Sequence, residues 1–259
     1  MNETPLRRLH GCRALITGAG SGIGLATAHR LTAEGAIVVI TDARGDAVER
    51  ATSEVAAPSI GLTCDVGDEA DVERTIGAAV AAVGGLDIVV TCAGITRTTE
   101  THLCALDEWE MVLRVNLTGT FLVLKHAIPH LIAAGGGSIV TIGSVASVVA
   151  AGRTSSYDAA KGGVLQLTRA VAVEYAEEHI RANCVLPGLV RTGLAANSAT
   201  IHGPMGSVSK ETASSRVRPP IAGHAAPSQI AGVVAFLASE DASFVTGAAI
   251  AADGGYTAI

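Results

Sequence analysis

The sequence predicts a single α/β domain, residues 1–259, in which a doubly wound parallel sheet is covered by helices on both faces. Short apolar runs alternate with helical patterns along the whole chain, and no linker rich in proline and glycine divides them. Apolar residues make up 49% of the chain and aromatic residues only 3%, so small aliphatic side chains must build the core. A glycine-rich turn joins the first strand to the first helix, as such sheets require.

Seven apolar stretches have the length and composition of buried strands. They cover residues 12–17, 36–41, 59–63, 85–90, 137–143, 181–186 and 244–252. Helices are expected at about residues 25–34, from about 68, at 107–134 and at 227–239, and a further helix that carries Tyr157 and Lys161 is expected to run to about residue 178. The sequence after residue 192 is rich in small and polar residues. A long segment of this kind after a strand end is typical of a functional loop, so we expect a substrate lid at about 189–223.

The first strand runs into the turn Thr17-Gly18-Ala19-Gly20-Ser21-Gly22-Ile23-Gly24, and a helix follows. Glycines let the backbone turn sharply and approach a pyrophosphate without a Cβ in the way. The helix N-terminus offers free N–H groups to the phosphates. A tight turn alone would also explain the glycines, but this context favours dinucleotide binding. The residues expected to bind it are Gly18, Ser21, Gly22, Ile23 and Gly24.

Asp42 ends the second strand, where an acidic residue can accept hydrogen bonds from the adenosine ribose. Its charge would also repel a 2′-phosphate. A basic residue directly after it, or at Ser21, would favour NADP, but Ala43 follows it and Arg44 is expected to start the next helix. The sequence therefore predicts NAD(H). Asp42 could also serve as a helix N-cap.

Two later strands end in residues that suit the same cofactor. Asp65 and Val66 follow the third strand and could bracket an adenine, although Asp65 could equally cap the helix that starts near Asp68. Ala93 and Gly94 follow the fourth strand, and a glycine there again lets the backbone approach the cofactor.

Tyr157 and Lys161 stand one helical turn apart, and Ser144 ends the strand before them. A nearby ammonium favours phenolate over phenol, so the pKa of Tyr157 is expected to fall from about 10 towards neutrality. Such a phenol could exchange a proton with an alcohol. Asn116 lies inside a predicted helix, where its amide competes with the backbone, so it is either a satisfied buried amide or a functional one.

Charge and composition argue against several classes of function. The net charge is −6 and no run of Lys or Arg appears, so neither nucleic acid nor a membrane surface is an expected partner. The five cysteines form no Cys-x-x-Cys pair and are expected to be reduced and buried, and no metal site is predicted. No apolar signal core opens the sequence, so a cytoplasmic protein is expected.

Taken together, the pattern resembles the short-chain dehydrogenase/reductase family from about residue 11 to the end of the chain. The resemblance implies a Rossmann-type sheet of seven parallel strands in the order 3-2-1-4-5-6-7. The positions that carry it are Thr17, Gly18, Gly22, Gly24, Asp65, Ala93, Gly94, Asn116, Ser144, Tyr157, Lys161, Pro187, Gly188, Thr192, Asp253, Gly254 and Gly255.

The resemblance also implies roles. Tyr157 would be the general acid/base, and Ser144 would hold and polarise the substrate oxygen. Lys161 would bind the nicotinamide ribose and lower the pKa of Tyr157, while Asn116 would hold a water that links Lys161 to solvent. Hydride would pass between the nicotinamide and the substrate carbinol carbon. The nicotinamide carboxamide would be held by Thr192 and by the backbone of Pro187, Gly188 and Val190.

The sequence departs from the family pattern in two places. Cys92 stands where the family usually has Asn, so the adenosine-side turn is expected to be looser, with catalysis retained. Gly223, Ala225 and Gln229 replace the Arg, Gly and Glu that often precede the last helix. Family members are commonly tetramers of 222 symmetry, built partly on the helices that carry Asn116 and Tyr157, and a homotetramer is expected here.

The leading hypothesis is an NAD(H)-dependent oxidoreductase that interconverts a secondary alcohol and a ketone. A rival is a 3-oxoacyl-(acyl carrier protein) reductase, which uses NADPH and docks an acidic carrier on basic residues. Asp42 and the negative net charge count against the rival. A third hypothesis, a catalytically silent NAD-binding regulator, would be expected to lack the Ser, Tyr or Lys. The basic residues that leave the rival open are Arg153, Arg191, Arg216 and Arg218.

The substrate itself is only broadly bounded by the sequence. Small apolar residues follow Ser144, and Arg153 precedes Tyr157 by a helical turn. Arg153 could meet an anionic or hydroxylated substrate, or it could be a solvated residue at a helix start. A small or mid-sized secondary alcohol is expected, for example a polyol, a sugar or a hydroxy acid. The predicted lid contributes Leu194, His202 and Met205.

Overall fold

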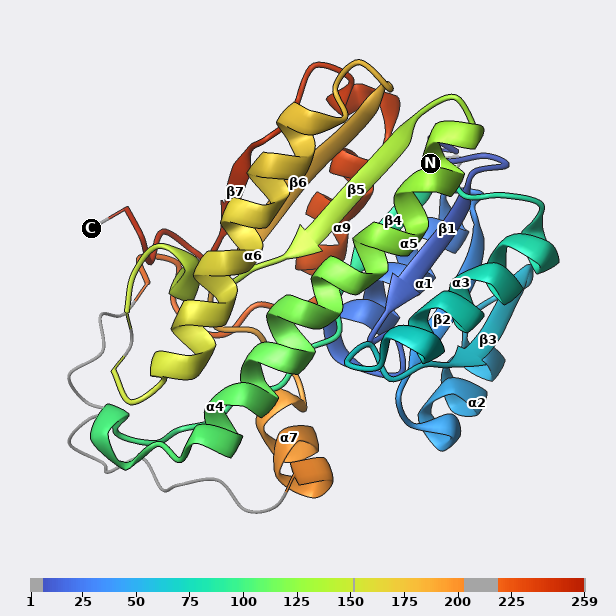
Figure 1. The fold of residues 1–259 in the computed structure, drawn as a ribbon. Coiled ribbons are helices and arrows are strands. Elements are labelled where there is room, and N and C mark those ends of the chain that lie inside the picture. Colours follow the sequence, from blue (N-terminus) through green and yellow to red (C-terminus); the bar gives the residue numbers. More distant parts are fainter. Residues whose placement is uncertain (1–6, 151, 203–218, 259) are drawn as a thin grey trace.

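The computed structural model describes residues 7–150, 152–202 and 219–258, and within them all seven strands form one parallel sheet (Figure 1). Their order is β3-β2-β1-β4-β5-β6-β7, which confirms the expected topology. The connection from β3 to β4 passes over β2 and β1, whereas every other connection leads to a neighbouring parallel strand, as in doubly wound sheets. The strands are β1 (Arg13–Thr17), β2 (Ile37–Asp42), β3 (Ser59–Thr63), β4 (Ile88–Thr91), β5 (Gly137–Ile142), β6 (Ile180–Pro187) and β7 (Ala249–Ala252).

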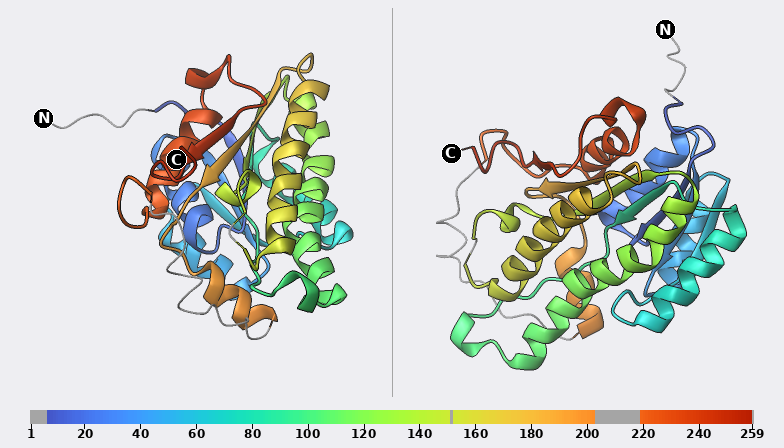
Figure 2. Two further views of the ribbon diagram at one scale, coloured as in Figure 1. Left: turned by 90° about the vertical axis from the view of Figure 1, so that its left-hand side faces the viewer. Right: turned by 45° about the horizontal axis from the view of Figure 1, so that its top comes forward.

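Helices cover both faces of the sheet (Figure 2). One face packs under α1 (Gly22–Ala33), α2 (Gly45–Glu54) and α9 (Pro227–Ala238). The other packs under α3 (Glu69–Val83), α4 (Leu106–Leu113), α5 (Gly119–Ala133) and α6 (Ser155–Glu174).

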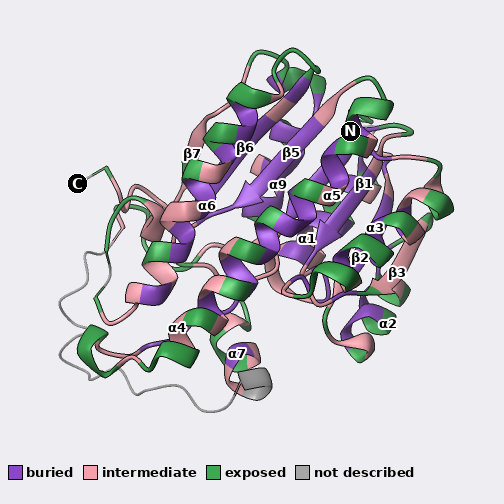
Figure 3. Cartoon of the chain, viewed as in Figure 1, coloured by how far each residue is buried: buried purple, intermediate pink, exposed green. Residues whose placement is uncertain are grey.

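Alternate residues of each central strand belong to different halves of the core. Leu15 and Val89 face α3 and α5, while Ile16 and Val90 face α1 and α9. Because successive side chains of a strand point to opposite faces, a strand buried on both sides must be apolar throughout. The central strands β1, β2, β4, β5 and β6 are accordingly buried along most of their length, whereas the edge strands β3 and β7 are partly exposed (Figure 3).

The predicted helix at 107–134 is wrong in one respect, because a π-helical turn, η2 (Arg114–Thr118), separates α4 from α5. The amide of Asn116 donates to the carbonyl of Val112 at 2.9 Å, and the hydroxyl of Thr120 donates to the carbonyl of Asn116 at 2.8 Å. These side chains occupy carbonyls that an α-helix would use, and such turns are frequent at functional sites.

Element boundaries also shift. The first helix begins at Gly22 rather than near residue 25, α6 ends at Glu174 rather than near 178, and β7 is shorter than the predicted strand at 244–252. The predicted lid contains a helix, α7 (Leu194–His202). Its segment 203–218, with Met205, lies outside the described residues. The described residues also contain three short 3₁₀ turns, η1 (Thr101–Leu103), η3 (Val145–Ser147) and η4 (Glu240–Ala242).

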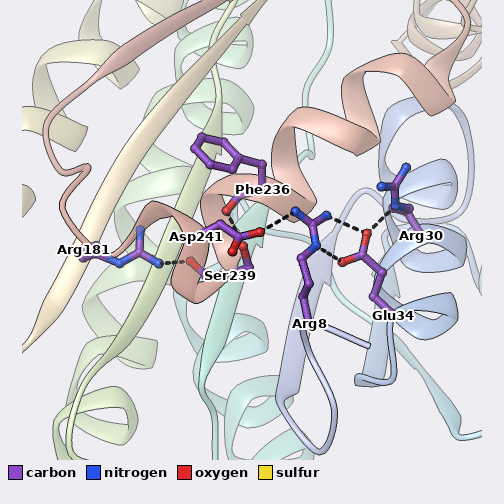
Figure 4. A network of polar contacts seen from close by, with 7 residues as sticks. All are labelled: Arg8, Arg30, Glu34, Arg181, Phe236, Ser239 and Asp241. Atoms are coloured by element: carbon purple, nitrogen blue, oxygen red, sulfur yellow. Dashed lines mark hydrogen bonds and ion pairs between the residues drawn. The ribbon is translucent and has the colours of Figure 1, made fainter. Parts of the chain in front are cut away.

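A polar network ties distant segments together where the strands begin (Figure 4). Arg8 donates to both carboxylate oxygens of Glu34 at 2.8 Å and to Asp241 at 3.0 Å, and Arg30 reaches Glu34 at 2.5 Å. Glu34 ends α1, and its arginine partners overcome the effect of its burial and hold its pKa below the usual range. The network therefore fastens the chain before β1 to both α1 and η4.

One helical stretch, Leu106–Ala133, is long and apolar enough to cross a membrane by length and composition. In this domain 56% of its most apolar window is buried against the rest of the protein, and a core helix passes the same test. All five cysteines are free, but only Cys64 and Cys184 are buried, whereas Cys12, Cys92 and Cys104 are partly exposed.

Candidate active site

A cavity of about 450 Å³ opens where the strands end, and every residue predicted for catalysis or cofactor binding lines it. The glycine turn and the ends of β2 and β3 form one part of the wall, and α6 with the segment after β6 forms another. The predicted residues that meet there are Gly18, Ser21, Gly22, Ile23, Gly24, Asp42, Asp65, Val66, Cys92, Ala93, Gly94, Asn116, Ser144, Tyr157, Lys161, Pro187, Gly188, Val190 and Thr192.

The glycine turn depends on its glycines for space and for backbone conformation. Gly18 has a φ of +62°, and a Cβ there would lie 2.7 Å from the Cα of Ala93. Gly22 has a φ of +57° and faces Thr192 closely. Ser21 occupies the N-cap position of α1, yet its side chain makes no capping hydrogen bond. The turn thus presents backbone N–H groups to the cavity, an arrangement suited to a phosphate group.

Asp42 is held at the end of β2 by three donors. Its carboxylate accepts from the backbone N–H of Gly20 at 3.2 Å and of Arg44 at 3.1 Å, and the Arg44 guanidinium lies 3.5 Å away. The N-cap of α2 is Arg44, so the alternative prediction that Asp42 is a helix N-cap is wrong. Arg44 starts the helix, as expected, but it also lines the cavity.

Asp65 also does not cap the next helix, because α3 is capped by Asp68, whose side chain accepts from the N–H of Asp71 at 3.1 Å. Asp65 instead accepts from the N–H of Gly67 at 2.9 Å and from Arg114 at 3.3 Å. The pair of Asp65 and Arg114 stands at the mouth of the cavity, and both residues line it.

Lys161 is almost fully buried, and its ammonium donates to the carbonyl of Ile142 at 2.7 Å. Burial lowers its pKa to about 8. Its Nζ lies 5.7 Å from the centre of the Tyr157 ring, so the helical spacing does bring the two side chains together. The hydroxyl of Ser147 donates to the Lys161 carbonyl at 2.8 Å and fastens α6 to η3.

The expected fall in the Tyr157 pKa is not what the protein groups produce. Burial raises the pKa of Tyr157 to about 12, and the hydrogen bond from Ser144 opposes that rise only in part. Desolvation of the phenolate therefore outweighs the neighbouring groups of the chain. Burial likewise disfavours the charged form of Lys161, so burial favours the uncharged form of both side chains.

Asn116 is a satisfied buried amide, which was one of its two predicted roles. Its Nδ2 donates to the carbonyls of Ile95 at 3.0 Å and Val112 at 2.9 Å, and its Oδ1 accepts from the N–H of Ile95 at 3.3 Å. The amide thereby fixes the segment after β4 beside Lys161. A Cβ on Gly94 would lie 2.7 Å from Asn116 Oδ1 and 3.6 Å from Lys161 Nζ.

Several lining residues were missed by sequence reasoning, because they belong to no local motif. They are Ala43, Arg44, Cys64, Ile95, Arg114, Val115, Ile142, Gly143, Leu189, Gly193, Asn197 and His224, whereas Leu194 was expected from the predicted lid. Arg114 could have been suspected, because it lies on the same turn as Asn116. Asn197 contacts Ser21 across 176 residues of sequence, a pairing that no spacing rule detects.

Arg153 does not line the cavity. It adopts a left-handed conformation with φ of 60°, its carbonyl accepts from the N–H of Thr99 at 2.8 Å, and its guanidinium lies 3.7 Å from Glu100. It is therefore neither a simple solvated residue nor a direct part of the cavity wall. Arg216 and Arg218, which had kept the carrier-protein rival open, lie outside the described residues.

The chain is similar over most of its length to a protein-family model, to known enzymes and to solved structures. A protein-family model described as "Enoyl-(Acyl carrier protein) reductase" matches residues 18–257. The chain is 43% identical to the cis-4-hydroxycyclohexanecarboxylate dehydrogenase of Sinomonas cyclohexanicum, over 95% of this chain and 96% of the relative. It is 37% identical to the cyclohexanol dehydrogenase of an Acinetobacter strain, over 94% of each. A solved short-chain type dehydrogenase/reductase from Mycobacterium marinum superimposes with a TM-score of 0.88 at 33% identity, over 98% of each chain.

Proposed function

Because the chain belongs to the short-chain dehydrogenase/reductase family, we propose that it interconverts a secondary alcohol and a ketone with NAD(H). The single observation that carries the proposal is the convergence of Ser144, Tyr157 and Lys161 on the wall of the cavity that the glycine turn also lines. A silent regulator would have no need to keep these three side chains together.

Tyr157 is the proton carrier of the proposed reaction. Ser144 lies close enough to the Tyr157 hydroxyl to oppose the rise of its pKa, so an alcohol oxygen held by both hydroxyls could exchange a proton with the phenol. The raised pKa of Tyr157 means that the chain alone keeps the phenol protonated, which is the form that donates to a ketone. The bound nicotinamide supplies or accepts the hydride.

Lys161 positions this site. Its ammonium is tied to Ile142 and stands close to the Tyr157 ring, and Asn116 holds Ile95 beside it. With a pKa near 8, Lys161 can change its protonation state close to neutral pH. It is thus suited to pass a proton from Tyr157 towards solvent, in line with the role that the family resemblance implies.

The residues present fit a dinucleotide, and Asp42 favours NAD(H). A Cβ on Gly20 would lie 2.8 Å from Asp42 Oδ2, so the glycine turn and the acidic residue are built against each other. The carboxylate is largely buried, accepts two backbone hydrogen bonds and pairs with Arg44, and this holds its negative charge at the end of β2 in the cavity wall. Arg44 is engaged with Asp42, so it is less available to a 2′-phosphate. Thr192 with Pro187, Gly188 and Val190 would hold the carboxamide.

The proposed substrate is an alicyclic secondary alcohol or its ketone. The cavity that Ser144 and Tyr157 line is also lined by the aliphatic side chains of Ile95, Leu189 and Leu194. The relatives whose names specify cyclohexanol and a hydroxycyclohexanecarboxylate suggest the same class. An aliphatic wall suits a saturated ring, because burying its carbon atoms is favourable without hydrogen-bond partners.

A panel of alcohols tests the proposal. Cyclohexanol, cis-4-hydroxycyclohexanecarboxylate, a polyol and a 3-hydroxyacyl thioester would each be offered with NAD and with NADP, and reduced cofactor followed by absorbance. We expect the ring alcohols with NAD to give a kcat/KM at least about tenfold above the other combinations, which corresponds to one well-placed interaction. Activity confined to the thioester with NADP would establish the carrier-protein reductase instead.

A further inference from the structure

Helix α7 is fastened to two distant parts of the chain by adjacent side chains. The Nδ2 of Asn197 donates to the hydroxyl of Ser21 at 3.2 Å. The hydroxyl of Ser198 accepts from the backbone N–H of Thr96 at 3.0 Å. One contact reaches the glycine turn and the other reaches the segment after β4, so α7 connects both sides of the cavity.

The two contacts differ in burial. Ser198 is 1% exposed, and its hydroxyl also donates to the carbonyl of Leu194 at 2.7 Å, so it is a buried anchor. Asn197 is only partly buried and lines the cavity. A partly exposed hydrogen bond between neutral groups is worth about 1 kcal/mol and can break without disturbing the core. The Asn197 contact is therefore the one that can open.

Ser21 is used in an unusual way. It is the N-cap of α1, with extended backbone angles of −164° and 173°, yet its side chain does not bond to the first turn of the helix. A serine at this position ordinarily accepts from one of those N–H groups. Here the hydroxyl accepts from Asn197 instead, and this leaves the N–H groups of the first turn to an anionic ligand.

The Asn197–Ser21 contact lies at the cavity wall next to that helix terminus. Gly22 and Thr192 approach each other at the same place, because a Cβ on Gly22 would lie 3.3 Å from the Thr192 methyl group. Both sides of the contact line the one cavity. A dinucleotide whose pyrophosphate rests on the N-terminus of α1 would lie beside this contact.

We propose that the Asn197–Ser21 hydrogen bond is a clasp that closes α7 over the bound dinucleotide, and that Asn197 is a positioning residue that sets how fast the cofactor leaves. The inference rests on the proposed function only as far as dinucleotide binding, and it holds for either nicotinamide cofactor. Opening the clasp exposes the pyrophosphate side of the cavity, while the Ser198 anchor keeps α7 attached.

Stopped-flow dissociation of NADH, followed by its fluorescence and repeated with NADPH, tests the clasp. Asn197→Ala and Ser21→Ala should each speed dissociation by about three- to tenfold, the range of one neutral hydrogen bond. The double variant should be no faster than the faster single variant, because the two residues act through one contact. Ala195→Ser, on the exposed side of α7, is the matched control and should dissociate like the wild type.

The outcomes separate the clasp from the wider proposal. If NADH dissociates from both single variants at the wild-type rate, the clasp is overturned while cofactor binding stands. The clasp is also overturned if the dissociation rate of the double variant rises by the product of the two single effects. Failure of the wild type to bind either cofactor would overturn the proposed function and the clasp together. Should a variant not fold, hydrogen exchange of the wild-type α7 amides decides: NADH should slow it, and unchanged exchange would contradict the clasp.

Discussion

Gly94 shows how tightly single residues constrain the catalytic centre. It lies where the segment after β4 meets Asn116 and Lys161, and an added Cβ would fall 2.7 Å from Asn116 Oδ1. That oxygen accepts from the backbone of Ile95 and cannot move away without losing the bond. The glycine is required here for space rather than for an unusual backbone angle.

Gly94→Ala should therefore displace Asn116 or Lys161 and lower kcat/KM by at least about tenfold, since small misplacements of catalytic groups are costly. Steady-state kinetics measures this. Gly77→Ala is the matched control, because Gly77 lies on the exposed side of α3 with nothing within 4 Å of an added Cβ. It should keep full activity and gain about 0.5–1 kcal/mol of stability. Equal activity in both variants would show that the Gly94 segment does not hold the site.

The opposite pKa shifts of Lys161 and Tyr157 make stability depend on pH in a defined way. In the folded protein the pKa of Lys161 falls from 10.5 to about 8, so between those values the unfolded chain binds more protons. The free energy of unfolding must then rise with pH in that window. The pKa of Tyr157 rises from 10.0 to about 12, so its contribution falls with pH between those values.

Denaturant unfolding at pH 7.5 and 9.5 checks the lysine effect. The wild type should gain on the order of 2 kcal/mol relative to Lys161→Met between the two pH values, because the variant lacks the titrating group. Groups common to both proteins cancel in the comparison. A pH-independent difference would mean that Lys161 is not desolvated in the folded protein.

At the scale of elements, Arg181 completes the end of α9. Its guanidinium donates to the carbonyls of Leu237 at 2.9 Å, Ser239 at 3.1 Å and Val245 at 3.4 Å, and Figure 4 shows it beside the polar network of Arg8. The last carbonyls of a helix have no partner within it, so a side-chain donor there removes a cost of folding.

Arg181→Met should lower the free energy of unfolding by about 2 kcal/mol, the usual value of charged hydrogen bonds. It should leave kcat/KM within about twofold of the wild type, because Arg181 lies at the opposite end of the strands from the cavity. Arg169→Met, an exposed residue on α6, is the control and should change stability by less than about 0.5 kcal/mol. Chemical denaturation measures the free energy of unfolding of both variants. Equal values would contradict the stabilising role of Arg181 at the end of α9.

The secondary-structure elements show most clearly what could be predicted from the sequence and what could not. The strands and most helices follow from local patterns, because a strand buried on both faces must be apolar. The strand order came from the family resemblance, since local patterns do not encode it. The π-turn at η2 could not be read, because it depends on contacts of Asn116 with Ile95, which only the fold brings together.

The same limit applied to the site. The glycine turn, Tyr157 and Lys161 are each marked by spacing, and the cavity contains all of them. The predicted direction of the Tyr157 pKa shift was wrong, because burial raises this pKa and burial depends on how the whole chain packs. Asn197 was missed because nothing local to α7 marks its contact with Ser21.

At the scale of the whole molecule, α5 and α6 leave aliphatic and aromatic side chains exposed. Phe121 is 46% exposed and Ile132 39%, and they lie eleven residues apart, close to three turns, on one side of α5. Val173 on α6 is 82% exposed. The two helices lie side by side on one face of the sheet (Figure 1). A shared apolar face of this kind suits a symmetric subunit interface.

We therefore propose a homotetramer that uses this face. Light scattering after size exclusion should give four chain masses for the wild type. Phe121→Glu with Val173→Glu should give smaller assemblies, because the charges would be buried at an apolar contact. Ser53→Glu, at an exposed serine of α2 on the other face of the sheet, is the control. A monomeric wild type would contradict the assembly.

The most direct test of the catalytic account is Tyr157→Phe, measured with the best alcohol from the panel and with NADH binding by fluorescence titration. The variant keeps the ring and its packing but cannot carry a proton. We expect turnover to fall by at least about a thousandfold, while the Kd for NADH stays within about threefold of the wild type. Turnover within tenfold of the wild type would contradict the assignment of Tyr157 as the acid/base.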